Sequence, residues 1–336
     1  MFKSNRYLPN IVLLSLAFLG ASANAQTLLK SVPPEERQVG IAYAAWQDKL
    51  PWRKTWGVPE LGPYLSNDVT VIRQHAEWLS NANVDFIYID WSNDLDTGVP
   101  GKPVQSRQIF IESATKTIFD VYAKLPRHPQ IVIMIGFPDE AAGLQDGRLQ
   151  RKADQVWTQF ASNPAYQNLY LHYLHHPLLL VYAGTPSPFG HGLPPWSDPR
   201  FTVRYMTGFV SQQPGLLAPG SVSRFGYWSW EDRGTPTVAA YDGTAEAMNI
   251  VAAWRGEGHG KIPPQGRRNG ATFREGWTRA REIGPHFALA GTFNEWSNPN
   301  EEPSAEVSKD IEPSHAFGTQ YLDMLRTEAA AFKGGR

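Results

Sequence analysis

Short apolar runs alternate with amphipathic segments along most of the chain. The runs that we interpret as strands cover residues 39–46, 85–91, 130–138, 177–184, 201–206, 224–230 and 286–296. The run QIVIMIGFP at 130–138 is apolar throughout, which is typical of a parallel strand buried on both faces. Between the runs, apolar residues recur at helical spacing, as at Ile111, Ala114 and Ile118. The pattern therefore predicts strands that alternate with helices.

Helices are predicted at residues 68–82, 111–125, 148–162, 271–283 and 317–332. Ser66 and Asn67 are the cap candidates for the first of them. Such alternation indicates a parallel sheet. A single-domain (β/α)8 TIM barrel needs eight strands, and we expect the missing strand within 233–265. A doubly wound open sheet is the alternative, although the chain has neither a Gly-x-Gly-x-x-Gly nor a Walker motif to support nucleotide binding.

The N-terminus has the features of a secretory signal peptide. Lys3 and Arg6 precede an apolar run at 11–19, and a small-residue cleavage pattern ends at Ala25. The run is too short for the alternative, a membrane anchor, because a spanning helix needs about 20 residues. We expect cleavage after Ala25 and a secreted or periplasmic protein, with an irregular lead-in at 26–37 and the barrel at 38–333.

Composition narrows the possible partners. The net charge of −1 gives no electrostatic reason to expect nucleic acid or an anionic membrane as a partner. The absence of cysteine excludes disulfides, thiolate metal sites and cysteine nucleophiles. The His-rich stretch at 171–176 matches no usual metal spacing and is interpreted as a turn. We expect a monomer without metal or cofactor.

Acids and tryptophans gather where the predicted strands end, which is where the active site of a barrel lies. Many of the twelve tryptophans occupy polar or proline-rich contexts, and exposed aromatic faces stack on sugar rings. The candidate catalytic residues are Glu295, Asp90 and Glu231. The candidate sugar-binding residues are Tyr43, Trp46, Trp91, Tyr182, Trp228, Trp230, Asn294 and Trp296.

Paired carboxylates beside aromatic side chains favour glycoside hydrolysis, in which one acid protonates the leaving oxygen and the other attacks or activates the nucleophile. Each acid also has a structural alternative. Glu295 could cap the last helix, Asp90 could bind loop N–H groups, and Glu231 could solvate a turn. At the level of function, the alternatives are a glycan-binding protein without turnover and a carbohydrate esterase.

Two motifs add a family resemblance. GTFNEW at 291–296 and IEPS at 311–314, followed by FGTQYLDML, resemble glycoside hydrolase families 99 and 71. The resemblance implies a (β/α)8 barrel that acts on α-linked glycans through a Glu-Trp-x-Glu pair. Glu295 matches the first acid, which deprotonates the sugar 2-hydroxyl, whereas the second position is Asn298, which cannot donate a proton as an acid. Either the second role falls to one of Glu301, Glu302, Glu306, Asp310, Asp90 or Glu231, or the chain does not follow the family mechanism.

Overall fold

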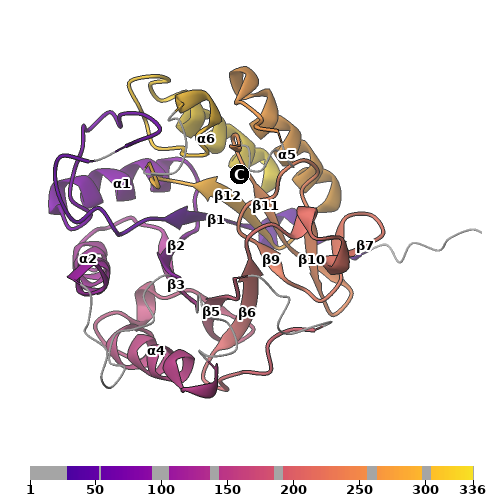
Figure 1. The fold of residues 1–336 in the computed structure, drawn as a ribbon, viewed down its shortest axis with the longest axis horizontal. Helices are drawn as coiled ribbons and strands as arrows, with labels where there is room; N and C mark the ends of the chain where they lie inside the picture. The colour runs from indigo at the N-terminus through magenta and orange to yellow at the C-terminus, as the bar shows by residue number, and fades with distance from the viewer. Residues whose placement is uncertain are drawn as a thin grey trace, which may run out of the picture.

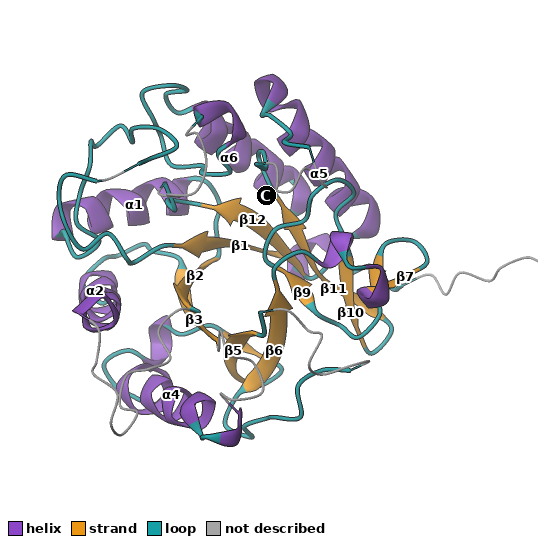
Figure 2. Cartoon of the chain, in the orientation of Figure 1, coloured by secondary structure: helices purple, strands orange, loops and turns teal. Residues whose placement is uncertain are grey.

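The computed structural model describes residues 29–52, 54–92, 106–136, 144–184, 192–255, 263–296 and 304–335. Its central feature is a curled sheet with eight parallel strands: β1 (Gln38–Tyr43), β2 (Phe86–Trp91), β3 (Gln130–Gly136), β5 (His176–Tyr182), β6 (Thr202–Thr207), β9 (Trp228–Ser229), β11 (Thr244–Ile250) and β12 (Phe287–Thr292). These strands lie side by side in the order β11-β12-β1-β2-β3-β5-β6-β9 and curl around a common centre (Figure 2). The fold is TIM-barrel-like.

The two ends of this series, β9 and β11, are joined through side chains. No backbone ladder between these two strands is present in the part of the chain that the structure describes. Instead, the Trp228 indole N–H donates to Glu246 at 2.9 Å, and the Asp232 N–H donates to Asn249 Oδ1 at 3.1 Å. The prediction of a strand within 233–265 is confirmed by β11, which pairs with the antiparallel β10 (Val238–Tyr241).

Helices cover the outside of much of the sheet (Figure 1). They are α1 (Val69–Asn81), α2 (Ser106–Tyr122), α4 (Arg148–Val156), α5 (Ala271–Ile283) and α6 (Gln320–Phe332). Among the described residues between β5 and β11, no α-helix occurs. That part holds 3-10 turns at Val210–Gln212 and Pro214–Leu216 and a small hairpin of β7 (Leu217–Ala218) and β8 (Val222–Ser223). The His-rich stretch forms another hairpin, in which β4 (His172–Tyr173) pairs with β5.

The start of α1 differs from the prediction. Asp68, and neither Ser66 nor Asn67, is the N-cap: its carboxylate accepts hydrogen bonds from the N–H groups of Thr70 and Val71. Ser66 instead accepts the Gln47 N–H. An N-cap side chain satisfies helix N–H groups that have no partner within the helix.

Side chains alternate between the inside and the outside of the barrel-like sheet. Phe86 and Tyr88 pack in the interior cluster, whereas Ile87 and Trp91 belong to the cluster beneath the helices. The interior is so tightly filled that a Cβ at Gly40 would lie 2.2 Å from the Phe86 ring. The same alternation brings Asp90, Tyr182 and Trp230 to the inner face at the strand ends, because they follow Tyr88, Leu180 and Trp228 by two residues.

The predicted signal peptide lies outside the described residues, as do Asn298, Glu301 and Glu302. Within the described residues, no helix is both long and apolar enough to cross a membrane.

Candidate active site

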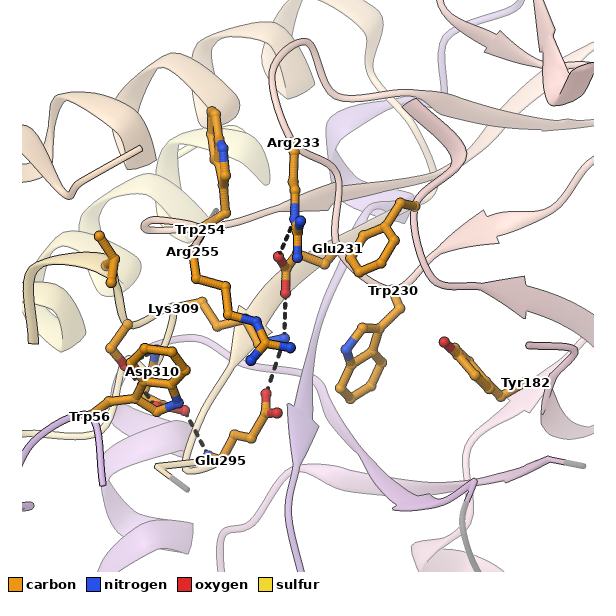
Figure 3. A pocket seen from close by; sticks show the side chains of 13 residues that line it. Trp56, Tyr182, Trp230, Glu231, Arg233, Trp254, Arg255, Glu295, Lys309 and Asp310 are labelled. Carbon is orange, nitrogen blue, oxygen red and sulfur yellow. Dashed lines mark hydrogen bonds and ion pairs between the residues drawn. The ribbon is translucent and has the colours of Figure 1, made fainter. Parts of the chain in front are cut away.

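A pocket lies at the C-terminal ends of the parallel strands, where both acids and aromatic rings point inward (Figure 3). Its aromatic lining consists of Trp56, Tyr182, Phe209, Trp230 and Trp254. Its charged lining consists of Glu231, Arg233, Arg255, Glu295, Lys309 and Asp310. Flat rings beside carboxylates suit the binding of a polar ring such as a sugar.

Lys309 joins two of the candidate catalytic acids. Its ammonium nitrogen lies 2.5 Å from Glu231 Oε2 and 3.0 Å from Glu295 Oε2. The two carboxylate oxygens are therefore no more than 5.5 Å apart. Separations of about 5–5.5 Å are typical of retaining glycosidases, and larger ones of inverting enzymes.

The charges of this cluster are set by its ion pairs. Burial alone would raise the pKa of Glu231, but Lys309 and Arg233 outweigh it and lower this pKa below the usual value. Burial alone would lower the pKa of Lys309, but Glu231 and Glu295 outweigh it and raise this pKa. Glu231 is thus ionised and Lys309 protonated at neutral pH, so Glu231 is poorly suited to donate a proton.

Asp90 has the opposite character. Burial raises its pKa to about 6, although the Ser92 N–H, donating to Oδ1 at 2.7 Å, acts against the rise. Its electrostatic neighbours include Glu295 and Lys309, which places it in the same cluster. Burial also raises the pKa of Tyr182 to about 12, with Asp90 as a further cause. Asp90 can therefore carry a proton in mildly acidic solution.

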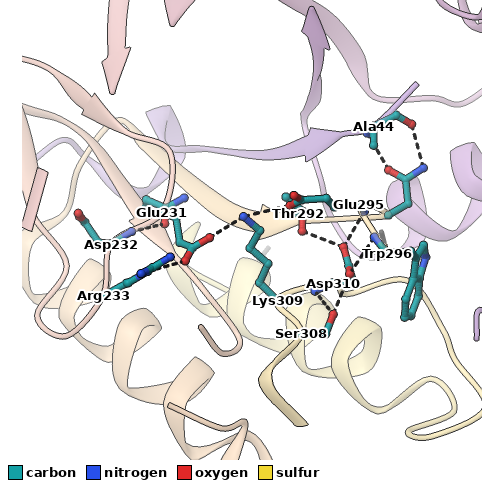
Figure 4. A network of polar contacts seen from close by, with 12 residues as sticks. Ala44, Glu231, Asp232, Arg233, Thr292, Glu295, Trp296, Ser308, Lys309 and Asp310 are labelled. Atoms are coloured by element: carbon teal, nitrogen blue, oxygen red, sulfur yellow. Dashed lines mark hydrogen bonds and ion pairs between the residues drawn. The ribbon is translucent and has the colours of Figure 1, made fainter. Parts of the chain in front are cut away.

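The loop that carries Glu295 is held by the buried Asp310 (Figure 4). Asp310 Oδ1 accepts the Glu295 N–H at 2.6 Å and the Thr292 hydroxyl at 2.8 Å. Its Oδ2 accepts the Trp296 N–H at 3.1 Å and the Ser308 hydroxyl at 2.7 Å. Trp296 has a φ of 48°, a left-handed conformation that is unusual for tryptophan. Asp310 therefore stabilises an uncommon backbone turn beside Glu295.

The Ile-Glu-Pro motif supports this loop from behind. The fully buried Glu312 accepts the Tyr64 hydroxyl at 2.8 Å, pairs with His75 Nε2 at 2.9 Å and accepts the Trp296 indole N–H. Each oxygen of Glu312 is therefore bound by buried side chains, which assigns it a structural role.

Comparisons with known proteins bear on this arrangement. No protein-family model and no curated protein matches the chain. Two solved structures titled GH99 endo-alpha-mannosidase from Bacteroides thetaiotaomicron share its architecture, and each match covers 89% of this chain and 98% of the other. One has 14% sequence identity and a TM-score of 0.59. The other, in complex with bis-tris-propane, has 16% identity and a TM-score of 0.60.

The chain has a GH99-like fold. This agrees with the resemblance drawn from the motifs at the end of the last strand.

Four of the residues predicted for the site meet in the pocket of the GH99-like fold. They are Glu231, Glu295, Tyr182 and Trp230. Asp90 belongs to their electrostatic cluster. Trp46 is half-buried, packs against the outer core and lies under the Arg107 guanidinium at 6.0 Å.

The remaining predicted sugar-binding residues are buried, and none of them lines this pocket. Tyr43 and Trp91 fall on the outward side of their strands, where they hydrogen-bond His75 and Thr115. Trp228 lies deep in the barrel-like interior against Glu246. Asn294 bonds both the N–H and the carbonyl of Ala44. Trp296 packs behind the loop, bound to Glu312. All five make buried contacts that stabilise the fold.

The structure also distinguishes between the acids proposed for the second catalytic role. Asp310 is fully engaged by the loop it holds, and Glu306 accepts the Arg268 N–H at 2.9 Å. Asp310 lines the pocket, but hydrogen bonds from the loop occupy both of its oxygens, so Asp90 is the better candidate for a proton donor.

Several lining residues were absent from the prediction: Trp56, Phe209, Arg233, Trp254, Arg255 and Lys309. The sequence could have indicated Trp56 as a pocket residue, since it lies in one of the polar, proline-rich contexts that are typical of an exposed ring. No sequence pattern indicates Lys309 and Arg255, because they lie in loops whose path depends on the whole fold. Among the described residues, no cluster of three or more His, Asp or Glu could hold a metal ion.

Proposed function

We propose that the protein is a glycoside hydrolase that cleaves α-linked glycans. The observation that carries the proposal is the gathering of Glu295, Glu231 and Asp90 with aromatic rings at the strand ends of a GH99-like fold. Barrel enzymes place their catalytic groups at this end, and glycoside cleavage needs two carboxyl groups of different protonation.

We assign the basic role to Glu295 and the acidic role to Asp90. Glu295 lies in the pocket on a loop fixed by Asp310, which favours a constant position relative to the substrate. Asp90 retains its proton at higher pH than an ordinary aspartic acid, as a general acid requires. Glu231 and Lys309 form a charged partner that orients Glu295.

The test is Glu295→Gln, which keeps the size of the side chain and removes its charge. Loss of a positioned acid–base group costs roughly 100- to 10,000-fold in rate, so release of reducing ends from α-linked glycans should fall to near background. Glu282→Gln, on the exposed side of α5, is the matched control and should retain full activity. Wild-type turnover by Glu295→Gln with an unchanged melting temperature would refute the assignment.

A second candidate function, glycan binding without turnover, is favoured by one observation. Lys309 lies between Glu231 and Glu295 and pairs with both, as an inert cross-link would. Prolonged incubation with a glycan panel separates the two functions, because a binding protein retains glycans without releasing reducing ends. We also propose that the protein is exported, on the basis of residues 1–25.

A further inference from the structure

Arg255 stands apart from the other charged groups of the pocket. Arg233 donates to Glu231 at 2.9 Å, and Lys309 pairs with both Glu231 and Glu295. Arg255 forms no ion pair with any described residue, and its buried Nη1 has no hydrogen-bond partner among them. Arg255 as a whole is half-buried, but a buried N–H donor that has no partner among the described residues calls for a specific explanation.

The position of Arg255 is fixed by its neighbours. The preceding residue, Trp254, exchanges both backbone hydrogen bonds with Gln265, at 3.0 and 2.9 Å. The guanidinium points into the pocket, and its carbon lies 5.9 Å from the centre of the Trp56 ring (Figure 3). An arginine held in this way presents its N–H groups to whatever occupies the pocket.

The chemistry proposed for the site makes a cation that has no acidic partner among the described residues unfavourable with a neutral sugar. Glycoside cleavage builds positive charge on the sugar ring, and a nearby guanidinium opposes that charge. A negative group on the sugar removes the conflict, because it pairs with Arg255. The planar fork of arginine matches the two oxygens of a carboxylate or a sulfate better than a lysine would.

We infer that the pocket binds an acidic glycan, whose carboxylate or sulfate group pairs with Arg255 beside Glu295. This inference deepens the proposed function, since it names the class of substrate for the same site.

The experiment uses three α-linked oligosaccharides that differ at one substituent: a uronic acid, a 6-sulfate ester and the neutral 6-hydroxyl parent. Binding is read from tryptophan fluorescence within the first second after mixing, before turnover accumulates, and cleavage is read from reducing ends. The wild-type protein should bind at least one acidic probe roughly 10- to 100-fold more tightly than the neutral parent, as expected for a charge-assisted contact. The preferred probe identifies the anion as carboxylate or sulfate.

Arg255→Met should abolish this preference, because it should weaken binding of the acidic probe far more than binding of the neutral parent. Arg255→Lys, which keeps the charge without the fork, should restore part of it. Arg73→Met, at an exposed position of α1, is the control and should behave as wild type.

The outcomes separate this inference from the proposed function. A preference for an acidic probe without release of reducing ends supports the inference and refutes the hydrolase. Equal affinities for all three probes, including no binding of any, overturn the inference. An equal loss of neutral and acidic binding in Arg255→Met also overturns it, because the residue would then act on pocket shape alone.

Discussion

Three buried carboxylates at the site have different surroundings, and their chemistry follows from this. Glu231 faces two cations, which hold it ionised. Burial raises the pKa of Asp90 to about 6, because it outweighs the side-chain and backbone hydrogen bonds with Ser92. Asp310 accepts four hydrogen bonds, yet burial and the nearby Glu295 raise its pKa to about 6. Its role follows from the backbone that it holds and not from its charge.

Asp310→Asn tests this positioning role. An amide offers N–H groups where the loop needs acceptors, so two of the four hydrogen bonds are lost and Glu295 shifts. Under the proposed function, kcat should fall about 100-fold, the cost of a misplacement of roughly 1 Å, with little change in KM. Asp323→Asn, a half-exposed acid on α6, is the control. A proportional loss of kcat and of folded protein would show instead that Asp310 only stabilises the fold.

Asp90→Asn should separate activity from stability. The folded-state pKa of about 6 lies above the ordinary value of 3.8, so folding favours the protonated form. This favourable contribution is complete below pH 4 and is lost as the pH rises through 6. At pH 8 the variant should therefore be more stable than wild type, by at most about 3 kcal/mol for a shift of roughly two pKa units, and nearly equal at pH 4.

The measurements are urea unfolding at both pH values and kcat/KM between pH 4 and 8. If Asp90 is the acid, wild-type kcat/KM declines above pH 6, and the variant is inactive throughout. A variant that is less stable than wild type at pH 8 would contradict the raised pKa.

At the scale of elements, the N-terminus of α1 depends on one side chain. Asp68→Ala removes the acceptor for two helix N–H groups and should reduce the free energy of unfolding by about 1 kcal/mol. Asn67→Ala is the matched control one residue earlier and should have no measurable effect. Urea unfolding measures the free energy of unfolding of both variants. An equal loss of this free energy in each would show that Asp68 is not the cap.

The sequence predicts elements well where their burial is uniform. β3 is apolar after Gln130, and the prediction placed both this strand and the helix that follows it. β11 was predicted only as a strand somewhere within 233–265. Its sequence TAEAMNI includes Glu246 and Asn249, which bond side chains and backbone inside the barrel-like sheet, so no apolar run marks it.

The site shows the same limit. Glu295, Glu231 and Asp90 were identified because they follow strands. Trp91 was chosen for the same reason and Tyr43 as an aromatic residue of the first predicted strand. Strand alternation turns both outward, and a sequence segment does not fix which face is inside. Once the structure shows that Phe86 and Tyr88 face inward, the alternation identifies which other residues of the strand face the site. Arg255 and Lys309 depend on contacts between loops that lie far apart in the sequence.

At the scale of the whole molecule, export is the property most open to a direct test. The leader predicts that protein recovered outside the cytoplasm begins at Gln26. N-terminal sequencing or intact mass of the fractionated protein measures this. An uncleaved chain in the membrane fraction would favour the anchor instead.

The pairing of β1 with β12 has a consequence for how the chain folds. Asn294 fastens the two strand ends through Ala44, so the first strand of the sheet finds one of its neighbours about 250 residues later. Contacts so distant in sequence slow folding, and until β12 is synthesised β1 presents an unpaired edge, a surface prone to aggregate. A growing chain therefore carries an open sheet through most of its synthesis. The late strand β12 then pairs with β1 and covers the exposed edge.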